Sequence, residues 1–455
     1  MNRIKQNKIT FVLILTALAI IFSSLTILSL PVLFNYKSKV TVIEKNFYKN
    51  FKIHLITSGK ISYKPFPKPH LLVEKASINF NKIRQNDDFI NTSDLRIFIS
   101  LRNVYLRNFN NLISTEISNT NLDLKISNLY EIREHLYQKI NKPIIFNNCK
   151  IFIKNKKNEV ILISPLKKII YKIHDKKKVK SLDITGEIFG LTFRSDWKRN
   201  YSTPKFTYHD ISILNPNIEI KNIFEFDNNK KFKVQSEASY FNDKLKYLTQ
   251  YDTNKIKISS PNNKKTNYNL DSKIQLNPFY FEGELTIKNK KIEKILDFIF
   301  SNFLSYDESY IGNFNGLLKI KFDKLSNKLI KKGELELFFN EKKINLKKAK
   351  FNLDKIGYIN TKVSFVEDRG DLKFISKNQL KIENYIEFAK TFQISSKKIK
   401  NIKQINFDLI RNIGQTDLII TNIKINNIEN KNKSNKVFIV KNIQNLRSHI
   451  RNVID

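Results

Sequence analysis

A run of 26 residues without a charged side chain, Ile9 to Phe34, most constrains what this chain can become. As a helix rising about 1.5 Å per residue, the run would be about 39 Å long, enough to cross a hydrocarbon core of about 30 Å with some tilt. No other stretch approaches the length of a membrane span. We therefore expect one transmembrane helix over residues 9–34, with everything that follows it on one side of the membrane.

The residues before this run set its expected orientation. The leader, residues 1–8, carries Arg3, Lys5 and Lys8. Positive residues favour the cytoplasmic side, so the leader should stay in the cytoplasm and the bulk of the chain should lie across the membrane. Lys37 and Lys39 on the far flank weaken this argument without reversing it. The alternative is a secretory signal cleaved near Ser29, but the apolar part of such a signal spans only about 7 to 15 residues.

The charge balance is strongly basic, with 81 Lys and Arg against 42 Asp and Glu and a net charge of +39. Only 12 of the basic residues are Arg, and the lysines are spread along the whole chain. Sites that read nucleic acids favour clustered Arg forks, so we expect no nucleic-acid partner. The abundance of Lys, Asn and Ile is typical of AT-rich codon usage, and attraction to anionic lipid surfaces is a second reason for the charge.

Patterns that carry catalysis or metal binding are not recognisable. The six histidines are isolated from one another, and the sequence has no HExxH, no G-x-S-x-G and no Gly-rich phosphate loop. Cys149 is the only cysteine, so an intramolecular disulfide is excluded, and its apolar neighbours predict a buried strand residue. Trp197 is predicted to pack structurally near a strand end. We expect no enzyme, no metal and no cofactor, although a dispersed active site has no spacing signature.

Alternation of apolar and polar residues dominates the rest of the chain. It predicts strands with one apolar and one wet face, and the short turn signals between them favour antiparallel hairpins. The predicted fold class is mainly β, with an elongated, curled antiparallel sheet that forms a groove or an open half-barrel. Helical spacing is confined to three short amphipathic stretches, 129–140, 292–303 and 385–392. A capping-box-like start at Asn128 and Glu131 supports the first of them.

The apolar face of such a sheet must be covered. It can close on itself as a sandwich, or it can stay open as a groove that acyl chains fill, at about 0.8 kcal/mol for each buried CH₂. Two strand patterns supply the candidate lipid-contacting residues: Ile218, Ile220, Phe224, Phe226, Leu318, Ile320 and Phe322.

A proline-rich corner follows the apolar run. Ser58-Gly59-Lys60-Ile61 opens an apolar strand, and Pro65, Pro67 and Pro69 interrupt it before a second strand at Leu71-Leu72-Val73. Prolines fix φ and remove ladder donors, so they predict a stiff corner between two strands. This arrangement resembles the N-terminal signature of the AsmA-like family. The resemblance extends to Asp94-Leu95-Arg96-Ile97, to 129–140 and to 184–193, and more weakly to 312–320, while the low Gly count departs from the family pattern.

The resemblance implies a single-pass protein of the bacterial inner membrane, with a cytoplasmic N-terminus and its bulk in the periplasm. It also implies a curled sheet that binds or moves phospholipid or another acyl-chain lipid and supports outer-membrane assembly, without catalytic residues. The expected regions are 1–8 (leader), 9–34 (span), 37–200 (AsmA-like β region) and 201–455 (β-rich groove region). The alternative is a scaffold or adaptor with a closed core that recruits envelope assembly proteins and carries no lipid.

Overall fold

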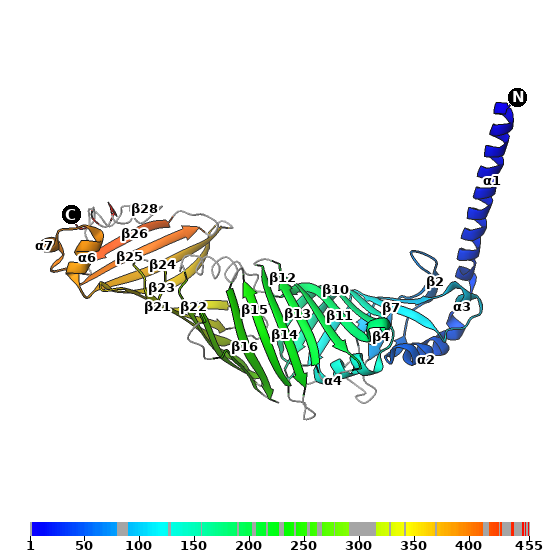
Figure 1. Ribbon diagram of the computed structural model, residues 1–455, viewed down its shortest axis with the longest axis horizontal. Coiled ribbons are helices and arrows are strands. Elements are labelled where there is room, and N and C mark those ends of the chain that lie inside the picture. Colours follow the sequence, from blue (N-terminus) through cyan, green and yellow to red (C-terminus); the bar gives the residue numbers. More distant parts are fainter. Residues whose placement is uncertain are drawn as a thin grey trace. The chain divides into compact units, whose positions relative to one another are not determined.

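The architecture was obtained as a computed structural model, and it divides into two compact units, residues 1–230 and 231–455 (Figure 1). The described residues are 2–455 except for 80–89, 126–128, 156, 189–190, 203–205, 215–216, 227–231, 241–242, 253–254, 262–265, 277, 291–314, 327–328, 341–342, 369–370, 413–417, 427, 430–437, 441–447, 450, 452–453 and 455. The sequence-based division at residue 200 stays a prediction about sequence regions.

The first unit begins with helices and continues as strands (Figure 1). Its helical elements are α1 (Asn2–Ser29), η1 (Leu30–Leu33), η2 (Lys37–Lys39), α2 (Val40–Phe51), α3 (Leu101–Tyr105), α4 (Leu129–Glu134), the π-helical turn η4 (His135–Lys139) and η5 (Asp175–Lys177). Its strands are β1 (His54–Thr57), β2 (Ile61–Lys64), β3 (His70–Val73), β4 (Ala76–Asn79), β5 (Ile90–Thr92), β6 (Asp94–Ile99), β7 (Leu112–Ser118), β8 (Asn121–Lys125), β9 (Ile144–Lys154), β10 (Val160–His174), β11 (Val179–Ile188), β12 (Leu191–Asn200), β13 (Phe206–Ile213) and β14 (Ile218–Phe226).

One long apolar helix starts the chain. The segment Leu13–Leu33, from α1 and η1, is long and apolar enough to cross a membrane. Its most apolar window is not buried inside the protein, although Pro31 near its end is. This agrees with the predicted span at 9–34 as far as length and composition reach.

Two sheets build the first unit. The small one has the order β1-β4-β5, and the large one runs β2-β3-β6-β7-β9-β10-β11-β12-β13-β14. Strands β7 and β8 share one edge of β9 and run parallel to it, and the other pairings are antiparallel. The large sheet is open, because no described pairing joins β2 to β14. The predicted fold class is therefore confirmed in this unit.

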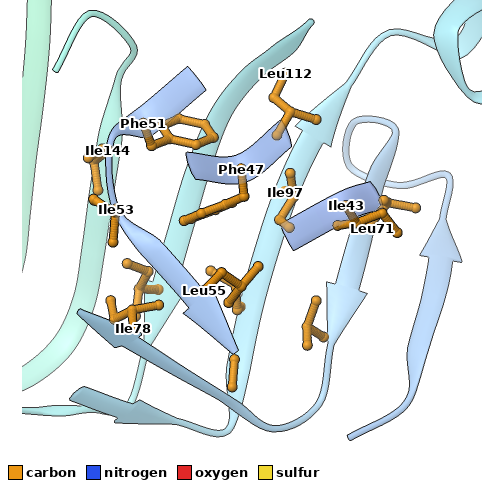
Figure 2. Close-up of a cluster of buried hydrophobic side chains, with 14 of the residues drawn as sticks. Ile43, Phe47, Phe51, Ile53, Leu55, Leu71, Ile78, Ile97, Leu112 and Ile144 are labelled. Carbon is orange, nitrogen blue, oxygen red and sulfur yellow. The ribbon is translucent and has the colours of Figure 1, made fainter. Parts of the chain in front are cut away.

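The core of the first unit lies where α2 and the small sheet cover the large one (Figure 2). Ile43, Phe47 and Phe51 recur every four residues, so they share one face of α2, and all three are fully buried. The same cluster contains apolar residues of β3, β6, β7 and β9: Leu71, Ile97, Leu112 and Ile144. This part of the apolar face is thus closed by the chain itself.

In the described residues, the second unit is an open sheet accompanied by short helices. Its strands are β15 (Phe232–Tyr240), β16 (Asp243–Asp252), β17 (Lys255–Ser259), β18 (Tyr268–Leu276), β19 (Phe279–Lys288), β20 (Gly316–Asp323), β21 (Lys332–Asn340), β22 (Lys343–Leu353), β23 (Gly357–Asp368), β24 (Asp371–Ile382), β25 (Gln404–Asn412), β26 (Leu418–Ile425), β27 (Ile428–Glu429) and β28 (Phe438–Val440). They pair in chain order up to β26, which pairs with both β27 and β28. Among these described pairings only that of β19 with β20 is parallel.

Helices α6 (Tyr385–Phe392) and α7 (Ser396–Ile399) pack on the last strands of the second unit. Asn384 caps α6, since its side-chain oxygen accepts hydrogen bonds from the backbone N–H groups of Ile386 and Glu387 at 3.1 Å. Phe388 and Phe392 point from α6 into a cluster with residues of β24 to β26. The apolar face is therefore closed at this end as well.

Several local predictions can be compared with these elements. The helices at 129–140 and 385–392 are confirmed as α4–η4 and α6, and the proline corner lies between the paired strands β2 and β3. Cys149 is buried in β9, as expected. The predicted helix at 292–303 and the cap at Asn128 lie outside the described residues.

We expect Phe47→Ala to lower the free energy of unfolding of the first unit by about 3–5 kcal/mol, because it empties a fully buried aromatic site. Val42→Ala is the matched control, since Val42 lies on the same helix and is 41% exposed. Urea unfolding followed by the fluorescence of Trp197, the only tryptophan, measures both variants. Equal losses for the two variants would contradict the assigned core.

Candidate functional site

The strands β11 to β14 present one apolar face, which we call the inner face. Pairing register aligns its residues in rows across the four strands, for example Ile184, Ser195, Ile211 and Ile220. Its apolar side chains are half-buried rather than fully buried: Leu182, Ile184, Phe193, Trp197, Ile211, Ile213, Ile218, Ile220 and Phe224. The opposite face carries exposed charged residues, including Arg194, Lys198, Asp210, Glu219 and Lys221.

Three rings lie together in the middle of the inner face. Trp197 and His209 are direct cross-strand neighbours, and their rings stack at 3.6 Å between centroids with an angle of 15°. Phe224 lies 5.0 Å from Trp197 and 5.9 Å from His209. Aromatic pairs at such separations contribute about 0.5–1.5 kcal/mol beyond their buried area. The three rings therefore form one rigid apolar platform across β12, β13 and β14.

Two polar side chains bond the platform from within the sheet. Ser195 Oγ accepts a hydrogen bond from Trp197 Nε1 at 2.9 Å and lies 2.9 Å from His209 Nε2. Asn222 Nδ2 lies 3.4 Å from His209 Nδ1, which makes Nδ1 the acceptor and places the ring proton on Nε2. Burial lowers the pKa of His209 to about 3. The histidine is therefore neutral, and the platform offers a ligand no net charge.

Two buried cations stand at one end of the inner face, on β11 and β12. Lys180 Nζ donates to the backbone oxygens of Tyr137 and Ile140 at 2.7 and 2.8 Å and to Asn141 Oδ1 at 2.9 Å. Arg199 Nη1 lies 3.1 Å from Glu134 Oε1. Lys180 thus donates to the carbonyl groups at the end of η4, and Arg199 pairs with Glu134 of α4. These contacts attach the helical segment α4–η4 to β11 and β12.

A cavity of about 490 Å³ opens beside these cations. Its wall combines aromatic, amide and charged side chains: Tyr137, Gln138, Asn141, Ile173, Asp175, Lys180, Arg199 and Tyr201. Both cations already have partners within the protein, and burial lowers the pKa of Lys180. The cavity is therefore a polar end to the inner face and has no spare charge for an anion.

In the second unit, the apolar side chains of β15 to β18 are mostly half-buried, and those of the strands after them are packed more tightly. The cluster on β19 to β22 is buried: Ile287, Ile320, Phe322, Leu335, Leu337, Phe339 and Ala349. The Phe351 ring lies against Gly333 so closely that a Cβ at position 333 would come within 2.5 Å of Phe351 Cδ1. This contact requires glycine at position 333. The cluster has the burial of an ordinary hydrophobic core.

The seven predicted lipid-contacting residues separate between these two environments. Ile218, Ile220 and Phe224 lie half-buried on the inner face, whereas Ile320 and Phe322 belong to the buried cluster and Leu318 is half-buried beside it. Phe226 ends β14, and its side chain lies outside the described residues. Pro65, Pro67 and Pro69 lie together in the corner between β2 and β3, away from both clusters in the strand order.

Sequence patterns alone did not single out His209, Asn222 or Lys180. His209 continues the alternation of Thr207, Ile211 and Ile213, so its position on the apolar face was readable, but its partners come from neighbouring strands. The described residues contain no group of three or more His, Cys, Asp or Glu side chains able to hold a metal ion. No protein-family model and no curated protein matches the chain.

We expect acid to weaken the first unit through His209. The unfolded histidine has a pKa of about 6.5 and the folded one about 3, so only the unfolded state takes up a proton between these values. This stability is fully present above pH 6.5 and is lost as the pH falls towards 3. Between pH 7 and pH 5 the native chain should lose about 2 kcal/mol more than His209→Gln.

Urea unfolding followed by Trp197 fluorescence suits this test, because Trp197 stacks on the titrating ring. Equal losses in the native chain and in His209→Gln would show that His209 is not held neutral in the folded state.

Proposed function

We propose that this chain is a membrane-anchored envelope protein whose inner face binds the acyl chains of phospholipid. In this proposal α1 spans the bacterial inner membrane, the leader is cytoplasmic, and the β-rich bulk lies in the periplasm. There the protein moves phospholipid and supports outer-membrane assembly, as the resemblance to the AsmA-like family implies.

The observation that carries the proposal is the half-buried state of the inner face. Leu182, Ile184 and Phe193 of this face pack against the core under α2 and the small sheet. The other apolar residues of the face, on β12 to β14, lie outside that core and are half-buried. Half-buried Ile, Phe and Trp side chains can gain further apolar contact from a hydrocarbon chain. Each buried CH₂ contributes about 0.8 kcal/mol, which can offset withdrawal of a lipid from a bilayer.

The aromatic platform suits this role for an electrostatic reason. An acyl chain forms no hydrogen bonds, so a face that binds it must not leave polar groups unsatisfied. Ser195, His209 and Asn222 bond to one another and to Trp197, and the histidine is neutral. Ser195 Oγ, Trp197 Nε1 and both ring nitrogens of His209 are thus hydrogen-bonded within the sheet, while the rings offer apolar surface.

A second candidate function rests on the buried cluster of β19 to β22. Ile320 and Phe322 are only 3% and 2% exposed, which is the burial of a closed core. A chain closed in this way throughout would serve as a scaffold or adaptor for envelope assembly proteins and would carry no lipid. We place lipid binding on the inner face of the first unit and assign a structural role to this cluster.

We expect Ile220→Glu to abolish the recovery of phospholipid with the purified full-length protein. The charge would lie on the inner face, where it repels hydrocarbon. Ile223→Glu is the matched control, because Ile223 lies on the same strand, points to the opposite face and is 40% exposed. Lipids are extracted from each protein and identified by mass spectrometry, with circular dichroism to verify folding.

Equal lipid content in folded Ile220→Glu and Ile223→Glu proteins would contradict lipid binding at this face. Unfolding of Ile220→Glu would mark a closed core there and favour the scaffold.

A further inference from the structure

The base of α1 is held by a segment far away in the sequence. The Tyr105 hydroxyl, at the end of α3, donates a hydrogen bond of 2.5 Å to the backbone oxygen of Ile27 in α1. The Tyr105 ring meets Phe34 edge-on with 6.0 Å between centroids. The guanidinium of Arg107 lies 5.1 Å from the centre of the Phe34 ring. Residues 101–107 therefore flank the last turns of the apolar helix.

These contacts fix the depth of residues 101–107 relative to the span. Ile27 lies six residues before Leu33, where the apolar stretch ends, and this corresponds to about 9 Å along a helix. A tyrosine that reaches Ile27 in a membrane-embedded α1 must therefore lie at the level of the bilayer surface or below it. Tyr is favoured at this interface, because its ring is apolar and its hydroxyl is polar.

The exposed side chains of the segment match this depth. Leu106 is 63% exposed and Tyr105 is 37% exposed, beside Leu33 at 84%. Exposed apolar groups at this depth are more stable when they enter a hydrocarbon boundary than in water.

Charge distinguishes the partner. Residues 101–111 and 30–43 contain no acidic side chain, whereas four basic residues border the apolar ones: Lys37, Lys39, Arg102 and Arg107. Basic residues close to a membrane surface are attracted by anionic headgroups, at about 1 kcal/mol each. An apolar tip with a basic border thus fits an anionic phospholipid surface.

We propose that residues 101–107 form a second membrane contact, inserting Leu106 at the headgroup boundary of the bilayer that α1 spans. The inference rests on the proposed membrane anchoring by α1. With two points of attachment, the helix and this segment, the first unit cannot turn freely about α1. The start of the large sheet is thereby held at the membrane surface.

Depth-dependent quenching tests this contact in the full-length protein. A single environment-sensitive dye is attached at Leu106→Cys, at Leu18→Cys within α1, or at Tyr208→Cys on β13, which is 52% exposed. The native chain serves as the labelling blank, since Cys149 is buried and burial raises its thiol pKa to about 11. The proteins are reconstituted in vesicles of phosphatidylethanolamine and phosphatidylglycerol, with and without spin-labelled lipid.

We expect spin-labelled lipid to remove most of the emission at positions 18 and 106 and to leave position 208 almost unchanged. Replacing phosphatidylglycerol by phosphatidylcholine should reduce quenching at position 106 and leave position 18 unaffected. Quenching at position 18 with none at position 106 would overturn the second contact alone. Absence of quenching at position 18 would overturn the membrane anchor and, with it, the contact that depends on it.

Discussion

The apolar face of the β-sheet has to be shielded from water, and much of the remaining structure follows from how this is done. In the first unit, α2 and the small sheet cover the strands that follow the membrane helix. In the second unit, α6 and α7 cover the last strands, and the strands β19 to β22 bury their own apolar side chains in a packed cluster. Partly exposed large apolar side chains also line β15 to β19 in the second unit. We place the ligand on the inner face of β11 to β14 because it combines such side chains with the platform of three rings.

Buried polar groups near the inner face have hydrogen-bond or ion-pair partners within the protein, or remain neutral. Lys180 and Arg199 are buried, but backbone carbonyls accept hydrogen bonds from Lys180 and Glu134 forms an ion pair with Arg199. These contacts hold α4–η4 in place. Desolvating a cation without such partners would cost several kcal/mol. His209 avoids the same cost by remaining neutral. The buried polar groups thus position the neighbouring elements, and the aromatic and aliphatic side chains of the inner face remain available to contact a ligand.

Much of this fold could be predicted from the sequence, because alternation and helical spacing are local. The strands, the corner at Pro65 to Pro69 and the helices α4–η4 and α6 are examples. Helix α2 is absent from our sequence-based predictions, although Ile43, Phe47 and Phe51 carry the spacing of a helix face.

Exposure could not be predicted in the same way. Ile220 and Ile320 both lie in stretches where apolar and polar residues alternate, yet the first is half-buried and the second is 3% exposed. The difference in exposure depends on what packs over each strand, and the alternation of residues within a strand does not indicate this. The His209 platform could not be predicted from the sequence either, because three strands must come into register before Ser195, His209 and Asn222 meet.

The most direct test of acyl-chain binding uses Trp197 as an intrinsic probe, since it is the only tryptophan and lies on the inner face. Full-length protein is loaded with phospholipid whose acyl chains carry bromine, a contact quencher of indole fluorescence. A Trp197→Phe, Tyr208→Trp variant moves the probe to the opposite face. Strong quenching of Trp197 with little quenching at position 208 is the expected result. Equal quenching at both positions, or none at Trp197, would contradict lipid binding on the inner face.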